Sequence, residues 1–204
     1  MDPSTICSEA ARNGDLYQLQ QARAAGHPWG QDTCASAAYR GHLEVLKWLR
    51  AQDPPCPWNE NTCVWAAQCG QLVILQWLRE HGCPWDEWTC VSAAYGGHCD
   101  LLQWARKEGC PWDVEVCYHA TYSGHWHLLQ WALQNGCPWD ERIHNVTQRT
   151  RTEQHQARQW LAQYYEWPWP PKIVSWLEAV TEMVDHRLDL LLCRDLLSLI
   201  KRYV

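Results

Sequence analysis

Cysteine and histidine are the side chains of this chain whose types suit chemistry, and both are abundant, with 12 Cys and 10 His among 204 residues. A thiolate is a nucleophile and a zinc ligand, and two close thiols form a disulfide. No Cys-x-x-Cys pair occurs, so the usual spacing of zinc ligands is missing. Cysteine makes up about 6% of the chain, below the roughly 8–10% of disulfide scaffolds.

The cysteines recur at a fixed interval instead of clustering. Eight of them form two series whose successive members lie 27 or 29 residues apart: Cys34, Cys63, Cys90 and Cys117, and Cys56, Cys83, Cys110 and Cys137. We interpret them as buried, reduced thiols that pack as small apolar groups. Disulfides and a thiol-based metal or redox role are the alternatives. Members of the two series that lie seven residues apart, such as Cys83 and Cys90, could approach each other across a connection.

Catalysis is not expected, because an active site needs one special nucleophile with an orienting base. Every candidate here is a residue that the sequence repeats, so we predict no catalytic residue, no metal ligand, no cofactor and no small-molecule substrate. The net charge of −6 gives no basic footprint for nucleic acid. No apolar run is long enough to span a membrane and the first residues lack a secretory pattern. We therefore expect a soluble protein in the cytoplasm or nucleus, monomeric when isolated.

Tryptophan follows the same interval and shows which elements position these residues. The chain has 16 Trp and no Phe, and Pro-Trp recurs every 27 or 29 residues, which indicates a repeat protein. The clearest unit, residues 89–113, predicts two short helices and a connection of about six residues. Thr89 is the expected N-cap, Gly97 ends the first helix, His98 starts the second and Gly109 ends it. The recurring tryptophans are expected in the core.

This unit resembles the ankyrin-repeat family. Ala-Ala-x-x-Gly-His-x-x-Leu-Leu with a terminal Gly is typical of that family, and residues 37–49 match it closely. The 27-residue unit is about six residues shorter than the usual ~33. It is similar to the short Cys-Pro-Trp repeats of large DNA viruses of protists and of some algae and oomycetes, so a viral protein inside a host cell is one implication. In this family the recurring His, here His42, His98 and His125, serves hydrogen bonding at the turn and helix start.

The resemblance implies an all-α solenoid of stacked helix-turn-helix repeats with clipped β-hairpin fingers. We place this repeat array at residues 1–171, with about six repeats of which the first and last are divergent. Residues 172–204 have a continuous apolar stripe. They form either a C-terminal helical cap or a segment that docks on a second protein.

A repeat array without catalytic residues predicts a scaffold or adaptor that binds another protein through the concave surface of its first helices. The two positions after Ala-Ala vary between repeats: Arg12-Asn13, Tyr39-Arg40, Gln68-Cys69, Tyr95-Gly96 and Tyr122-Ser123. We predict that their three tyrosines form an aromatic stripe, of the composition favoured at interfaces, although half-buried spacers would explain them too. Further contact candidates outside the regular series are Trp65, Trp88, Trp126 and His119. The alternative function is a structural subunit held permanently in a larger assembly.

Overall fold

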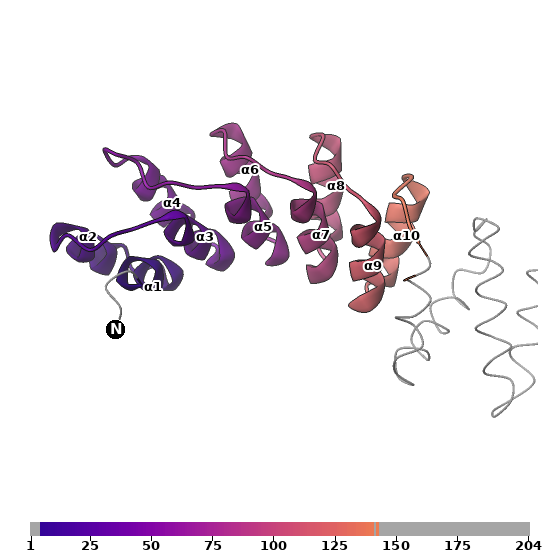
Figure 1. The fold of residues 1–204 in the computed structure, drawn as a ribbon, viewed down its shortest axis with the longest axis horizontal. Helices are drawn as coiled ribbons and strands as arrows, with labels where there is room; N and C mark the ends of the chain where they lie inside the picture. The colour runs from indigo at the N-terminus through magenta and orange to yellow at the C-terminus, as the bar shows by residue number, and fades with distance from the viewer. Residues whose placement is uncertain (1–4, 141, 143–204) are drawn as a thin grey trace, which may run out of the picture. The chain divides into compact units, whose positions relative to one another are not determined.

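A computed structural model describes residues 5–140 and residue 142, which belong to the first of two units of the chain, Met1–Ile143. This part of the chain contains ten α-helices and no strand (Figure 1). It is therefore all-α, as expected. None of its helices is long and apolar enough to cross a membrane. The predicted sixth repeat, in residues 143–171, and the predicted segment 172–204 lie outside the described residues.

The ten helices form five consecutive pairs, and each pair corresponds to one repeat of the sequence. The odd-numbered members, called the first helices below, are α1 (Ile6–Asn13), α3 (Gln31–Arg40), α5 (Glu60–Gln68), α7 (Glu87–Gly96) and α9 (Val114–Tyr122). The even-numbered second helices are α2 (Leu16–Ala24), α4 (Leu43–Arg50), α6 (Leu72–Glu80), α8 (Cys99–Lys107) and α10 (Trp126–Gln134).

Small side chains bring successive first helices together. In α3 the recurring cysteine Cys34 and the pair Ala37 and Ala38 are completely buried. Every other first helix buries its own Cys and Ala in the same way. Each first helix contacts the first helix of the next pair, from α1 through to α9. Leucines of the second helices, such as Leu46 and Leu49, close the other side of this core. The small residues permit close approach, and the leucines supply the buried apolar area.

The predicted helix ends are confirmed at glycine and wrong at threonine. Gly97 ends α7 in the left-handed conformation, with φ of +78°, and His98 is the residue before α8. The helix α7, however, begins at Glu87, and Asp86 is its N-cap: the Asp86 carboxylate accepts a hydrogen bond from the Trp88 amide at 3.1 Å. Thr89 is buried inside the first turn instead. An acidic side chain suits this helix end, because it binds an orphan amide and faces the positive end of the helix dipole.

The connections between pairs also follow the sequence pattern. Six residues separate α2 from α3, α6 from α7, and α8 from α9, as the clearest repeat unit predicted. Residues 51–59, between α4 and α5, form a longer connection of nine residues. This longer connection accounts for the 29-residue interval between the second and third repeats.

Candidate functional site

The described cysteines are free thiols, and nine of these eleven are buried. Four pairs of thiols lie close enough to interact: Cys34 with Cys56, Cys63 with Cys83, Cys90 with Cys110, and Cys117 with Cys137. Each pair joins a first helix to the connection that ends the same repeat. The neighbours are therefore not the residues seven apart that the sequence suggested. Spacing along the chain gave the wrong pairs because the second helix returns the chain to the start of its own repeat.

Each connection cysteine also fixes the start of a first helix. The Cys83 thiol donates to the Asn59 carbonyl at 3.4 Å, and Cys110 donates to Asp86 in the same way. The neighbouring Cys83 thiol, followed by burial, raises the pKa of the Cys63 thiol far above its ordinary value. Such a thiol stays protonated at neutral pH, and it is neither a nucleophile nor a ready metal ligand. No group of three or more His, Cys, Asp or Glu side chains suited to a metal ion occurs within residues 5–140.

The recurring histidines link neighbouring repeats. The Nε2 atoms of His42, His98 and His125 donate to backbone carbonyls at the end of the preceding first helix, at Arg12, Gln68 and Tyr95, over 3.0–3.1 Å. None of the three side chains caps its own helix. The expected role in hydrogen bonding is thus observed, but the partner is the previous repeat and not the helix that the histidine precedes.

Within residues 5–140 the recurring tryptophans are half-buried, which corrects the prediction that they form the core. In four repeats the tryptophan of Pro-Trp meets the tryptophan of the following second helix edge to face, for example Trp85 and Trp104 with ring centroids 5.9 Å apart. An arginine covers the outer side of each pair. The Arg79 guanidinium lies 4.1 Å from the Trp85 ring centroid and donates to the Cys83 carbonyl at 2.6 Å. The same arrangement recurs at Arg23, Arg50 and Arg106.

These arginines are structural residues that the sequence analysis missed. They recur at intervals of 27 and 29 residues, as the cysteines and tryptophans do. Their shared interval was the available signal. Since each of these indoles contacts both a second indole and a guanidinium, we assign these tryptophans to the packing between repeats.

All eight residues predicted to bind a partner lie on first helices, on a surface that we call the first-helix face. They are Tyr39 and Arg40 on α3, Trp65 and Gln68 on α5, Trp88 and Tyr95 on α7, and His119 and Tyr122 on α9. Four aromatic members are 41–49% exposed: Trp65, Trp88, Tyr95 and Tyr122. Trp126, the remaining contact candidate, is buried at the start of α10 and does not belong to the first-helix face.

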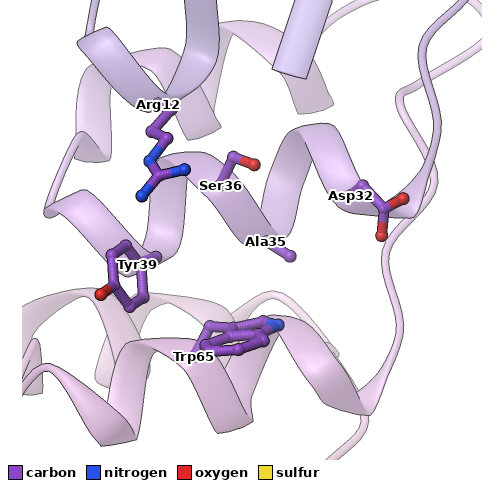
Figure 2. A pocket seen from close by; sticks show the side chains of 6 residues that line it. All are labelled: Arg12, Asp32, Ala35, Ser36, Tyr39 and Trp65. Carbon is purple, nitrogen blue, oxygen red and sulfur yellow. The ribbon is translucent and has the colours of Figure 1, made fainter. Parts of the chain in front are cut away.

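Tyr39 and Trp65 form the wall of a pocket of about 350 Å³ (Figure 2). Their rings meet edge to face with centroids 5.6 Å apart and planes at 81°. The Arg12 guanidinium lies 5.7 Å from the Tyr39 ring centroid, and Arg40 lies 5.5 Å from it. Figure 2 shows Arg12 and Tyr39 on one side of the pocket and Asp32 on the opposite side.

Small side chains form the remaining lining of this pocket, namely Ala35 and Ser36. Sequence analysis missed them together with Asp32, because it searched for large or unusual residues. A hollow arises where a repeat carries a small residue between large neighbours. The signal was therefore Ser36, at the position where the next repeat has Trp65.

The second aromatic cluster lies on α7 and α9. The Tyr95 ring meets His119 edge to face at 5.9 Å, His119 meets Tyr118 at 5.2 Å, and Tyr118 stacks on Tyr122 at 6.2 Å. Burial, opposed by the nearby Glu115 carboxylate, lowers the pKa of His119. Ring contacts thus join each tyrosine to residues of its own or the next repeat, and none within the described residues joins Tyr39 to Tyr95 or Tyr95 to Tyr122. The predicted stripe is two clusters.

Charges on the first-helix face are separated. Arg12 and Arg40 lie at the carboxyl ends of α1 and α3, and neither takes part in a salt bridge within the described residues. Acidic side chains lie at or just before the amino ends of first helices: Asp32, Glu60, Asp86 and Glu87. Burial, Glu87 and Glu60 all raise the pKa of Asp86, so these carboxylates sense one another. Arginines therefore lie where α1 and α3 end, and the carboxylates Asp32, Glu60, Asp86 and Glu87 form what we call the acidic edge, where the first helices begin.

Comparison with known proteins does not assign the chain to a family: no family model matches it, and neither does any curated protein sequence.

Proposed function

We propose that this chain is an ankyrin-type solenoid that binds another protein through the first-helix face. The observation that carries the proposal is the cluster of Tyr39 and Trp65, where the half-buried Tyr39 ring, the exposed Trp65 ring and Arg12 line a pocket and Arg40 lies near the tyrosine. Tyr, Trp and Arg are the residues that dominate binding energy at protein interfaces.

The ankyrin-type assignment draws support from the way one repeat joins the next. Each pair packs its small residues against the next first helix, and the recurring histidine bonds to the preceding repeat. Such an arrangement presents the outer positions of all first helices on a shared surface. These positions vary between repeats while the Cys, Ala and Trp positions stay constant. A scaffold that holds its packing residues and varies its surface suits recognition.

A binding role also explains why the thiols and histidines are engaged within the fold while the aromatic rings of the first-helix face are not. The paired thiols lie close to each other and bond to backbone carbonyls, and the recurring histidines bond to neighbouring repeats. The aromatic rings of the first-helix face are left half-exposed, where ring contacts limit their rotation. A side chain that is already ordered loses less entropy on binding.

The test is capture of a partner by the full chain, with crosslinking, followed by measurement of the dissociation constant for the identified partner. Tyr39→Ala, Tyr95→Ala and Tyr122→Ala are combined in one variant. Tyr17→Ala is the matched control, because Tyr17 lies on the second helix α2 and is 70% exposed. We expect the triple variant to remain folded and to lose at least tenfold in affinity. Equal affinity of the folded triple variant and the control would remove the first-helix face from the interface.

A further inference from the structure

The side-chain pattern at the Tyr39 pocket recurs two repeats further along the first-helix face. Two residues after the recurring cysteine, the first helices α3, α5, α7 and α9 carry Ser36, Trp65, Ser92 and His119 in turn. Small and large side chains therefore alternate from α3 to α9. Each serine precedes a tyrosine by three residues, and that tyrosine meets the large ring of the next repeat edge to face. The surface repeats itself every second helix pair.

The two sites have the same construction and different chemistry. The first consists of Ser36, Tyr39 and Trp65, and its counterpart consists of Ser92, Tyr95 and His119. The ring planes meet at 81° in the first site and at 79° in the second. Where the first site has Arg12 and Asp32, the equivalent positions of the second carry Gln68 and Trp88. The first site is charged, and the second is more aromatic.

The distance between the sites sets the length of a ligand that reaches both. Packed helices lie roughly 8–10 Å apart, so two steps along the first helices span about 16–20 Å. An extended chain advances about 3.3 Å per residue and covers this span in about five to six residues. Six is an even number, so two side chains six positions apart point to the same side of an extended chain. Each can then enter one site.

The charges between the sites specify the rest of the ligand. Glu60, Asp86 and Glu87 lie at or just before the amino ends of α5 and α7, along the span that joins the two sites. None of the three forms a salt bridge within the described residues. This acidic edge attracts basic side chains. At the end of the first site, Arg12 and Arg40 attract an acidic side chain and repel a basic one.

We propose that the partner binds as an extended segment with two bulky apolar side chains about six residues apart, one in each site. Basic residues between these anchors face the acidic edge, and an acidic residue next to the first anchor faces Arg12 and Arg40. This inference rests on the proposed function, because it assigns the ligand of the same face. An α-helix is the excluded occupant. At about 10–12 Å across, it rests on the protruding Trp65 and Trp88 rings and does not enter the sites.

The experiment selects ligands from a displayed library of random 15-residue peptides on the immobilised full chain. Enriched peptides are synthesised, and their dissociation constants are measured by fluorescence polarisation. We expect two bulky apolar positions six residues apart, Lys or Arg between them, and an acidic residue beside one anchor. Trp65→Ala and Tyr95→Ala should each weaken binding at least tenfold, and the control Tyr17→Ala less than twofold. Three glycines inserted between the anchors should weaken binding as much as loss of one anchor.

Several results overturn the extended segment while the first-helix face stays the binding surface. They are peptides with a single anchor, anchors about eleven residues apart as in a helix, tolerance of the glycine insertion, and sensitivity to only one of the two variants. Failure to enrich any peptide, with the captured partner still dependent on the tyrosines, overturns it too. Peptides and captured partner that are both insensitive to Trp65→Ala and Tyr95→Ala defeat the proposed function itself.

Discussion

Replacing Arg79 with methionine tests whether the guanidinium over each tryptophan pair stabilises the fold. The side chain donates to the Cys83 carbonyl at 2.6 Å and lies 4.1 Å from the Trp85 ring centroid. Methionine keeps an unbranched apolar stem that still covers the indole, so the variant removes the charge and the donor while retaining contact. The loss therefore reports on the hydrogen bond and the cation–π interaction.

The magnitude follows from these two contacts. A hydrogen bond from a charged donor contributes about 1.5–3 kcal/mol, and a partly exposed cation–π contact about 0.5–1 kcal/mol. Both depend on the same ordered side chain, so they are not simply additive. We expect Arg79→Met to lower the free energy of unfolding by about 1.5–3 kcal/mol.

Urea denaturation of the full chain, followed by circular dichroism, measures this change. The control is Arg12→Met, because the Arg12 guanidinium also lies over a ring, at 5.7 Å from the Tyr39 centroid, but its side chain donates to no carbonyl within the described residues. We expect Arg12→Met to stay within about 0.5 kcal/mol of the wild type. Equal losses for the two variants, or a loss below about 0.5 kcal/mol for Arg79→Met, would refute the structural role of the arginine.

Three further substitutions or measurements test other parts of the fold. Gly97→Ala should lower the free energy of unfolding more than Gly109→Ala does. Both residues have positive φ, which strains an alanine by about 1–2 kcal/mol, but of the two only Gly97 would place a Cβ 2.5 Å from the His125 ring. Equal losses in urea denaturation would argue against packing of the histidine on this glycine. In peptide-resolved alkylation of the native chain at pH 8, Cys83 should react far more slowly than the half-buried Cys69; similar rates would contradict buried thiol pairs. The folded-state pKa of His119 lies below its unfolded value. The unfolded state therefore binds more protons as pH falls from 7 through about 6.5, and the stability of the fold decreases. His119→Gln should reduce that decrease, and an unchanged pH dependence of the urea midpoint would be evidence against a lowered pKa.

The pairing of helices was predictable because its signals are local. Glycine at positions such as Gly97 ends a helix because it readily takes the left-handed conformation, and Ala and Cys at helical spacing predict close packing. The first turn was misjudged, because threonine and aspartate both suit an N-cap. The carboxylate of Asp86 binds the helix start, whereas Thr89 packs inside.

Burial of the tryptophans was not predictable from their interval. A fixed period shows that two positions are equivalent, and it does not show how deep they lie. The half-buried state of Trp85 depends on Arg79, which lies six residues earlier in the chain and covers the ring. The arginines share the period and could have been grouped with the tryptophans on that ground.

The candidate site was predictable as a surface and not as a set of contacts. All eight residues lie on first helices, at positions that vary from repeat to repeat. Which ring meets which depends on the register between neighbouring helices, so the contact of Tyr39 with Trp65 instead of another tyrosine required the structure. The hollow depends on Ser36, a residue too small to attract notice in the sequence.

Affinity of the captured partner for first-helix variants tests the central claim most directly. Trp65→Ala is the most informative change, because Trp65 is exposed, lines the pocket and contacts Tyr39. Titration calorimetry of the full chain with the partner should show at least tenfold weaker binding for this variant and an unchanged dissociation constant for Tyr17→Ala. A dissociation constant within twofold of the wild type for both variants would contradict binding through the first-helix face.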